Sequence, residues 1–311
     1  MNIKTRFLVV SDTHADPISE SLPSMPVDVA IYCGDLTEES KLREMEVTLE
    51  LLRSINAPLK LVIPGNHDFT LDLPVFRKKI VEANLLDEPE LGKREYGDFG
   101  QARDLFKQAE KDGIMLLDEG THQFTLQNGA QLKVYATFSL RPRRDTYEIE
   151  NGVDVVITHG PPRGILDRNT KDKPQSCGHP EAVARSRPRM HCFGHIHEAW
   201  GAKLVAWGNT SGEHPSHLTA IDNSRSKTIE TLTSLRRTEW DTPETAERRP
   251  RYNAERCCRT SHCEGDEHPV RSGENTLFIN AAIQSLEEGP QQLPWVVDID
   301  LPRVTREEVR R

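Results

Sequence analysis

FLVVSDTH, residues 7–14, joins a short apolar run to a polar turn, and the same pattern returns four more times. It recurs as VAIYCGD at 29–35, LKLVIPGNHD at 59–68, VDVVITHG at 153–160 and MHCFGHIH at 190–197. Runs this short and this rich in Val and Ile are typical of strands buried on both faces. Each predicted strand therefore ends in residues that can bind a ligand.

The segments between these strands favour an α/β fold. Residues Glu38–Ser54 carry apolar side chains at intervals of three and four, which predicts a helix with one buried stripe. A strand–helix–strand order implies a right-handed crossover between neighbouring parallel strands. A second helix is predicted from Arg103 to Lys111, closed by Gly113, and a hairpin is predicted to turn at Asn128-Gly129.

Composition narrows the functional classes. The net charge of −9 argues against non-specific binding to nucleic acid, because there is no basic excess to replace phosphate counterions. We expect no membrane span and no secretory signal, since apolar runs of the required kind are missing. Six scattered cysteines, with Cys33 and Cys192 in strand-like runs, favour a reducing, cytoplasmic location.

The character of the sequence changes after Trp200. We expect a first domain part at 1–201, a polar and flexible insertion at 202–275, closing strands within 276–302, and a frayed tail at 303–311. Inside the insertion, KLVAW and HLTAID look like short strands, while Arg236 to Asn275 shows hardly any apolar periodicity. The latter stretch contains Cys257, Cys258, His262, Cys263 and His268. A zinc site there is one interpretation, but solvated coil is favoured because no CxxC pair is present.

The polar residues at the strand ends form the candidate site. Ligands gather beyond the carboxyl ends of strands in open α/β sheets, so we expect these residues to converge. The two-residue spacings of Asp12 and His14 and of His195 and His197 place each pair on one side of an extended segment. The candidate metal ligands are Asp12, His14, Asp35, Asn66, His159, His195 and His197.

This ligand set predicts a two-metal hydrolase of phosphate esters. A mixture of imidazole, carboxylate and carboxamide without thiolate suits Mn, Fe or Zn, and we expect Mn to support activity best. Seven ligands suit two metals that share a carboxylate, polarise phosphoryl oxygens and lower the pKa of a bridging water to about 7, so that a hydroxide becomes the nucleophile. His67 is not needed as a ligand, and its protonated ring could donate to the leaving group as a general acid.

The ordered blocks SDTH, GD, GNHD, THG and GHIH resemble the signature of the calcineurin-like metallophosphoesterase superfamily. The resemblance implies a four-layer α/β/β/α sandwich of two mixed sheets flanked by helices. It implies that Asp12, His14 and His197 bind the first metal and that Asp35 bridges. It further implies that Asn66, His159 and His195 complete the second site, and that Asn66 and the acid His67 contact substrate.

Flanking residues are similar to the metallophosphoesterase-domain-containing phosphodiesterases and their fungal relatives. The similar segments include GNHDFTLD, THGPPRGILD, the CGH at 177–179, HCFGHIHEAWG, and FINAA followed by WVVDIDLP. This resemblance implies a small phosphodiester substrate, cyclic nucleotides among the candidates. The chain departs from the family at TFSLRPRRD, residues 137–145, where a Ser-Pro-aromatic segment is common.

Alternatives remain open at this point. A phosphomonoesterase of the same fold would use the same ligands, and a non-catalytic scaffold could retain a metal site. Protein phosphatase activity is disfavoured because GDLTEES lacks the DRG that marks those enzymes. The sequence pattern indicates neither the protein partners nor the physiological substrate.

Overall fold

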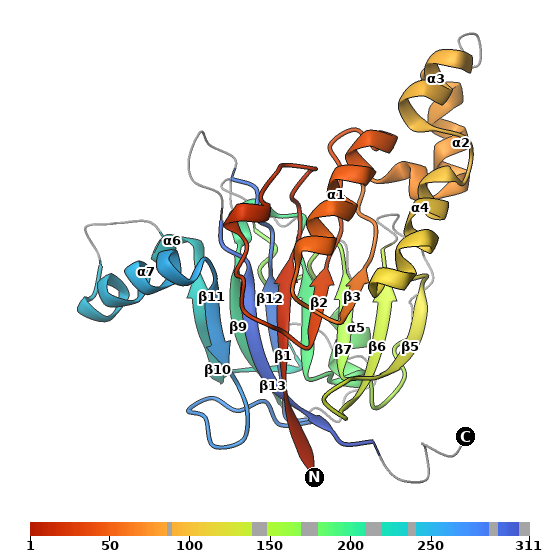
Figure 1. The fold of residues 1–311 in the computed structure, drawn as a ribbon. Helices are drawn as coiled ribbons and strands as arrows, with labels where there is room; N and C mark the ends of the chain where they lie inside the picture. Colours follow the sequence, from red (N-terminus) through yellow and green to blue (C-terminus); the bar gives the residue numbers. More distant parts are fainter. Residues whose placement is uncertain are drawn as a thin grey trace.

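Two mixed β-sheets packed face to face form the centre of the molecule (Figure 1). The computed structural model describes residues 1–85, 89–138, 148–168, 180–208, 219–235, 241–285 and 292–304. The first sheet has the order β11 (Cys258–Ser261), β13 (Trp295–Pro302), β1 (Asn2–Val10), β2 (Val29–Tyr32), β3 (Leu59–Val62) and β4 (Ile114–Leu116). The second has the order β10 (Ile221–Thr231), β9 (Gly201–Trp207), β12 (Asn275–Asn280), β8 (Met190–Phe193), β7 (Val155–Thr158), β6 (Gln131–Thr137) and β5 (Gly120–Thr125).

Parallel pairing dominates the middle of both sheets. β1, β2, β3 and β4 run parallel in that order, as the strand–helix–strand pattern predicts. In the second sheet β6, β7, β8 and β12 are parallel, while β5, β9 and β10 add antiparallel pairs. The carboxyl ends of the parallel strands therefore meet at one edge of the molecule.

Alternation along the strands divides the core into layers. Phe7 and Val9 of β1 face the second sheet, and Leu8 and Val10 face the helices on the other side. The helices α1 (Leu42–Ser54) and α4 (Gln101–Ala109) cover the first sheet, and α5 (Pro180–Ser186) packs on the outer face of the second. This is the four-layer α/β/β/α sandwich that the family resemblance implies.

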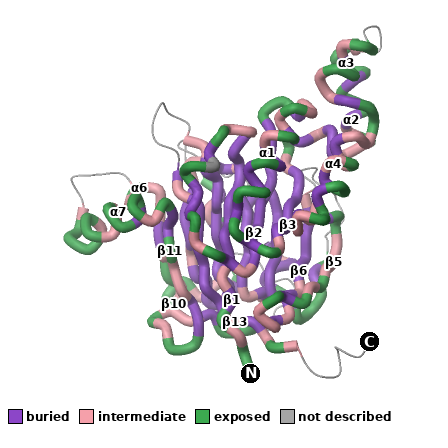
Figure 2. The backbone as a smooth tube through the Cα atoms, viewed as in Figure 1, coloured by how far each residue is buried: buried purple, intermediate pink, exposed green. Residues whose placement is uncertain are grey.

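Two helical parts extend away from the sandwich (Figures 1 and 2). The short turn η2 (Phe69–Leu71) leads into α2 (Leu73–Glu82) and α3 (Pro89–Tyr96), which carry many exposed residues. At the opposite side, α6 (Leu232–Leu235) and α7 (Pro243–Glu255) follow β10. Short turns η1 (Ser19–Ser21), η3 (Glu110–Asp112) and η4 (His197–Ala199) complete the described helical segments.

The predicted helices and hairpin are present, with one shifted boundary. The first helix begins at Leu42 rather than Glu38, because the Glu44 carboxylate accepts hydrogen bonds from the Glu39 and Lys41 amides at 3.0 Å and caps the helix there. α4 and η3 together span the second predicted helix. At the hairpin turn, Gly129 has φ +86°.

The prediction of a solvated coil from Arg236 to Asn275 was wrong for residues 241–275. The chain forms α7 there, and β11 then joins the first sheet in parallel with β13. Cys257 and Cys258 are fully buried, and the Tyr252 hydroxyl donates to Glu230 of β10 at 3.0 Å. The buried residues of this segment are three cysteines, Tyr252, His262 and Val270, at positions that follow no hydrophobic period, so the sequence pattern gave no signal of burial.

Several expectations fall outside the described residues. These are most of the unusual segment after Thr137, the CGH at 177–179, the first residues of HLTAID and the tail beyond Val304. KLVAW lies in β9, and the closing strands appear as β12 and β13. Within the described ranges, no helix has the length and apolar character needed to cross a membrane.

A buried carboxylate joins three strands of the first sheet. Asp298 of β13 accepts from Arg6 of β1 at 2.7 Å (Nε) and 3.0 Å (Nη2), and lies 3.0 Å from the ammonium of Lys4 and 3.7 Å from the guanidinium of Arg259 in β11. Burial alone would raise the pKa of Asp298, but the hydrogen bonds from Arg6 and Lys4 outweigh burial and lower it. The carboxylate therefore stabilises the fold at pH values above the ordinary carboxyl pKa. This stabilisation is lost as the pH falls through the lowered pKa of Asp298.

We expect Asp298→Asn to lower the free energy of unfolding by about 2 kcal/mol at pH 7, the usual size of a hydrogen bond to a charged group. Urea unfolding at pH 7 and near pH 3 measures the difference in unfolding free energy between the wild-type protein and the variant. This difference should be smaller at the lower pH. Glu46→Gln, which alters an exposed carboxyl of α1, is the matched control. An equal loss at both pH values would contradict the role of the charge.

Candidate metal centre

Loops at the carboxyl ends of β1, β2, β3, β7 and β8 bring the predicted ligands to one edge of the sandwich. Four of these residues have left-handed backbone conformations: φ is +56° at Asp12, +50° at His14, +52° at Asp35 and +67° at His195. Such angles are uncommon for residues other than glycine and cluster at functional sites. The chain is bent after β1, β2 and β8 so that these side chains turn toward the shared edge.

The first group of side chains contains Asp12, His14 and His197. One potential ligand atom of each lies within 4.8 Å of those of the other two. The His197 Nε2 is 3.3 Å from the Asp12 Oδ1. These are the three residues that the resemblance assigns to the first metal.

The second group contains Asp35, His159 and His195, with the same 4.8 Å limit among their ligand atoms. The His159 Nε2 lies 3.2 Å from the Asp35 Oδ2 and 2.9 Å from the Asn66 Oδ1, so Asn66 adjoins this group. The Asp35 Oδ2 is also 4.0 Å from the His14 Nε2. Asp35 thus stands between the two groups, and all seven predicted ligands are gathered at one place.

The chemistry of the second group fits a cation. The His159 Nδ1 donates to the Cys33 carbonyl at 2.9 Å, which leaves Nε2 directed at the oxygens of Asp35 and Asn66. A neutral ring would point a lone pair at those oxygens, so the arrangement requires either a proton or a metal ion on that side. An imidazole fixed through its other nitrogen is also the usual form of a metal-binding histidine.

The first group and its surroundings fit a metal equally well. Among the described residues the buried His14 Nε2 and His197 Nδ1 have no hydrogen-bond partner. Three glycines leave room for the ligands. A Cβ on Gly194 would lie 2.0 Å from the Asp12 Oδ2, one on Gly65 would lie 2.2 Å from the Asp35 Oδ1, and one on Gly34 would lie 2.6 Å from the His159 Nδ1.

Burial and charge set opposing pKa shifts within the site. Burial alone would lower the pKa of His159, but the charge of Asp35 and its hydrogen bond to the ring raise it to about 9. Burial alone would raise the pKa of Asp35, but His159 lowers it. Burial and the charge of His159 lower the pKa of His195 to about 4. Metal-binding imidazole is neutral, so a metal ion on the His159 Nε2 would take the place of a proton there.

His67 lies at the border of the first group. Its ring centroid is 4.7 Å from that of His14, and its Nδ1 lies 2.6 Å from the Glu38 carbonyl oxygen. The His67 amide donates to the Asp35 Oδ1 at 2.9 Å. With Nδ1 donating to a carbonyl, Nε2 is the ring nitrogen left for another contact.

Sequence reasoning missed two residues of the site and left a third undecided. Glu38 lies 2.9 Å from the His14 Nδ1, and its only signal was its place three residues after Asp35. Gln292 lies 95 residues after His197 in the chain, and its side chain donates to the His197 carbonyl at 3.0 Å. Nothing in the sequence pattern pointed to Gln292.

Asp68 is the undecided residue. It accepts from the amides of Gly65, Leu36 and Thr37 at 2.7–3.0 Å, so it connects the loop after β2 to the loop after β3. Burial, with the charge of Asp35, raises the pKa of Asp68 to about 7.

The Cys/His cluster that invited a zinc interpretation does not form a comparable group. Within the described part of the chain, the three groups of His, Cys, Asp or Glu with metal-binding spacing contain no cysteine, and all lie at the strand edge. Two of them are the groups above, and the third consists of His14, Glu38 and His67.

The family model of the calcineurin-like phosphoesterases matches residues 5–199, which include every residue of the two groups. The chain belongs to the calcineurin-like phosphoesterase family. It is 33% identical over 228 residues to metallophosphoesterase domain-containing protein 1 of Homo sapiens and, equally, to that of Mus musculus. The match covers 67% of this chain and 64% of each relative, so it spans less than two thirds of their length. A solved phosphopantetheinyl hydrolase of Mycobacterium tuberculosis aligns with 65% of this chain and 85% of its own, at 18% identity and a TM-score of 0.40.

The close approach of Gly194 to Asp12 can be tested by substitution. We expect Gly194→Ala to displace Asp12 and to reduce the divalent metal that the purified protein retains, measured by elemental analysis after equilibration with Mn²⁺ and desalting. Gly92→Ala is the matched control, because a Cβ there meets its nearest atoms at 3.7 Å. Full metal content in Gly194→Ala would show that the first group does not hold a metal.

Proposed function

We propose that this calcineurin-like phosphoesterase is a dinuclear-metal phosphodiesterase that acts on small phosphodiesters, with cyclic nucleotides among its candidate substrates. The observation that carries the proposal is the carboxylate of Asp35, which lies between two groups of ligands and also accepts from the amide of His67. Two metal sites and an acid are the parts that hydrolysis of a phosphodiester at neutral pH requires.

The residues would divide the work as follows. Asp12, His14 and His197 would hold one metal, Asn66, His159 and His195 the other, and Asp35 both. Bound divalent metals, of which Mn²⁺ is the one we propose to support activity, would polarise the phosphoryl oxygens and provide the nucleophile at neutral pH. Gln292 and Asp68 would hold the ligand loops in place through backbone hydrogen bonds.

His67 is proposed to protonate the leaving oxygen and to hydrogen-bond phosphate together with Asn66. Its Nδ1 lies against the Glu38 carbonyl, which accepts but cannot donate, so this contact fixes the ring through Nδ1–H. Nε2 would then carry the proton that moves to the leaving group. General acids of this kind contribute roughly 10²–10⁴-fold to rate.

Two other functions are separated by simple assays. A phosphomonoesterase would share the metal ligands and prefer p-nitrophenyl phosphate over its diester. A non-catalytic scaffold would turn over neither substrate. The complete set of ligands and the acid favour an enzyme, and a cavity beside Asn66 that can receive a second ester group favours the diester.

We expect the protein loaded with Mn²⁺ to hydrolyse bis(p-nitrophenyl) phosphate with a higher kcat/KM than p-nitrophenyl phosphate, and chelation to abolish both activities. Asp35→Asn should lower diester turnover at least about 10²-fold, because both metals lose a ligand charge. A higher kcat/KM for the monoester would move the assignment to a phosphomonoesterase. An absence of turnover with Mn²⁺, Fe²⁺ and Zn²⁺ would refute the enzyme assignment.

The acid role of His67 makes a finer prediction. With an alkyl leaving group, which needs a proton, His67→Ala should lower kcat roughly 10²–10⁴-fold. With p-nitrophenolate, which leaves without protonation, the loss should be much smaller. Metal content should stay unchanged in this variant. Equal losses on both classes of leaving group would mean that His67 acts only by positioning.

A further inference from the structure

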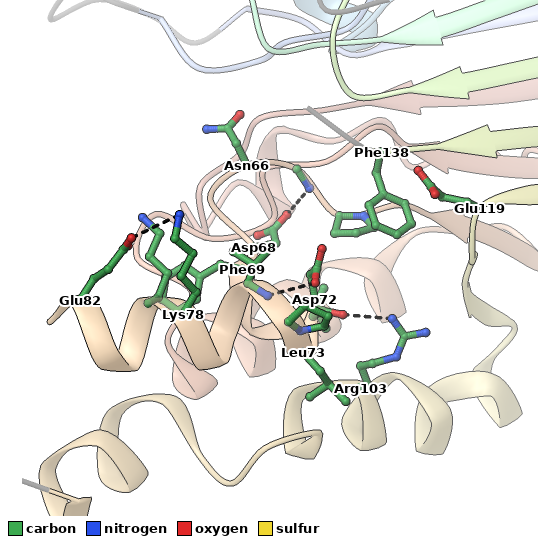
Figure 3. A pocket seen from close by; sticks show the side chains of 16 residues that line it. Asn66, Asp68, Phe69, Asp72, Leu73, Lys78, Glu82, Arg103, Glu119 and Phe138 are labelled. Atoms are coloured by element: carbon green, nitrogen blue, oxygen red, sulfur yellow. Dashed lines mark hydrogen bonds and ion pairs between the residues drawn. The ribbon is translucent and has the colours of Figure 1, made fainter. Parts of the chain in front are cut away.

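A cavity opens beside the candidate metal centre (Figure 3). It has a volume of about 680 Å³, within the range of small-molecule sites, and lies between the segment that leads from β3 into α2 and the end of β6. Asn66 and Asp68 line it from the side of the metal centre. It therefore adjoins the second group of ligands directly.

His67 takes no part in the wall of the cavity. The described lining residues include Gly65, Asn66 and Asp68 but not His67. The ring of His67 turns instead toward Glu38 and packs against His14. A phosphodiester bound at the metals with its leaving oxygen near His67 would thus have its other ester group on the side of the cavity.

The walls of the cavity suit a flat, uncharged group. Phe69 of η2 and Phe138 at the end of β6 are half-buried on it, and Leu73 of α2 adds aliphatic surface. Aromatic faces favour offset or edge-on contact with another ring. Figure 3 shows Phe138 on the side of Glu119, with Leu73 and Arg103 on the helical side.

Several charged residues around the cavity are engaged with other partners, and the Lys79 ammonium lies over the Phe69 ring, 5.7 Å from its centroid. Lys78 lies 3.3 Å from Glu82, and the Arg103 guanidinium bonds to Asp118 and donates to the Leu71 carbonyl at 3.0 Å. Asp72 caps α2 by accepting from the Val75 amide at 3.2 Å. A second anionic group on the substrate would have to compete for these cations, whereas an apolar ring would not.

We propose that this cavity is the specificity site for the ester group that stays on phosphorus, and that it selects an aromatic group there. The proposal rests on the phosphodiesterase function proposed above. Hydrolysis breaks only the bond between phosphorus and the leaving oxygen, which takes its proton from His67, and water supplies the new oxygen on phosphorus. The group in the cavity then leaves as a phosphomonoester.

Two substrates with the same leaving group and charge test the assignment. Phenyl p-nitrophenyl phosphate and methyl p-nitrophenyl phosphate differ only in the group assigned to the cavity. We expect kcat/KM to favour the phenyl substrate by roughly 10- to 100-fold, after correction for the ratio of the uncatalysed rates. This factor corresponds to the free energy usually gained by burying an apolar ring. The difference should lie mainly in KM.

Two variants separate a specific cavity from a general packing effect. Phe138→Ala removes one wall, and Leu73→Trp fills the cavity without removing packing. Both should lower the phenyl-to-methyl ratio at least about fivefold. Phe99→Ala is the matched control. Phe99 is 52% exposed, packs on Phe76 with ring centroids 4.7 Å apart and is not among the described residues that line the cavity. The phenyl-to-methyl ratio of kcat/KM in Phe99→Ala should therefore equal that of the wild-type protein.

An unchanged ratio in Leu73→Trp, or an equal change in Phe99→Ala, would overturn the assignment of the cavity while leaving the phosphodiesterase function intact. Failure of the wild-type protein to hydrolyse either substrate would overturn the function itself, and the assignment with it. If Phe138→Ala does not fold, Leu73→Trp alone decides, because it adds bulk at a half-buried position.

Discussion

The carboxylate of Asp35 is the interaction on which the rest of the site depends. Its Oδ2 lies 3.2 Å from the His159 Nε2 and 4.0 Å from the His14 Nε2, and its Oδ1 accepts from the His67 amide. One side chain thus touches ligands carried by both sheets and the residue proposed as the acid. This position demands a left-handed backbone at Asp35 and leaves no room for a Cβ on Gly65. The loops after β2 and β3 are therefore built around a single buried charge.

Much of this arrangement could be predicted from the sequence because it is local. Mostly apolar runs of four or five residues, each followed by Asp, His or Asn, specify both the parallel sheet and the edge where ligands meet. The two-residue spacings fix which side chains share a face. The helix boundary at Leu42 escaped prediction because Glu38 is held by contacts to His14 and His67 instead of by the helix. Contacts between distant loops leave no periodic trace in sequence.

The same reason explains the error in the segment 241–275. β11 is a four-residue strand at the edge of a sheet, and α7 precedes it. Both are held by residues far away in the chain: Asp298 lies beside Arg259 of β11, and Glu230 accepts from Tyr252 of α7. The one buried residue of β11 is Cys258, so the strand has no apolar pattern of its own. The cavity beside Asn66 escaped prediction likewise, because its walls combine the end of β6 with the segment after β3. Only the packing of the two sheets brings these parts together.

Two metal ions that share Asp35 are central to the proposed site, and anomalous diffraction from crystals equilibrated with Mn²⁺ tests their presence most directly. We predict two peaks roughly 3.5–4 Å apart. One should lie among Asp12, His14 and His197, the other among Asn66, His159 and His195, and both should lie within bonding distance of the Asp35 carboxylate. A single peak at this edge, or two peaks of which only one touches Asp35, would contradict this prediction.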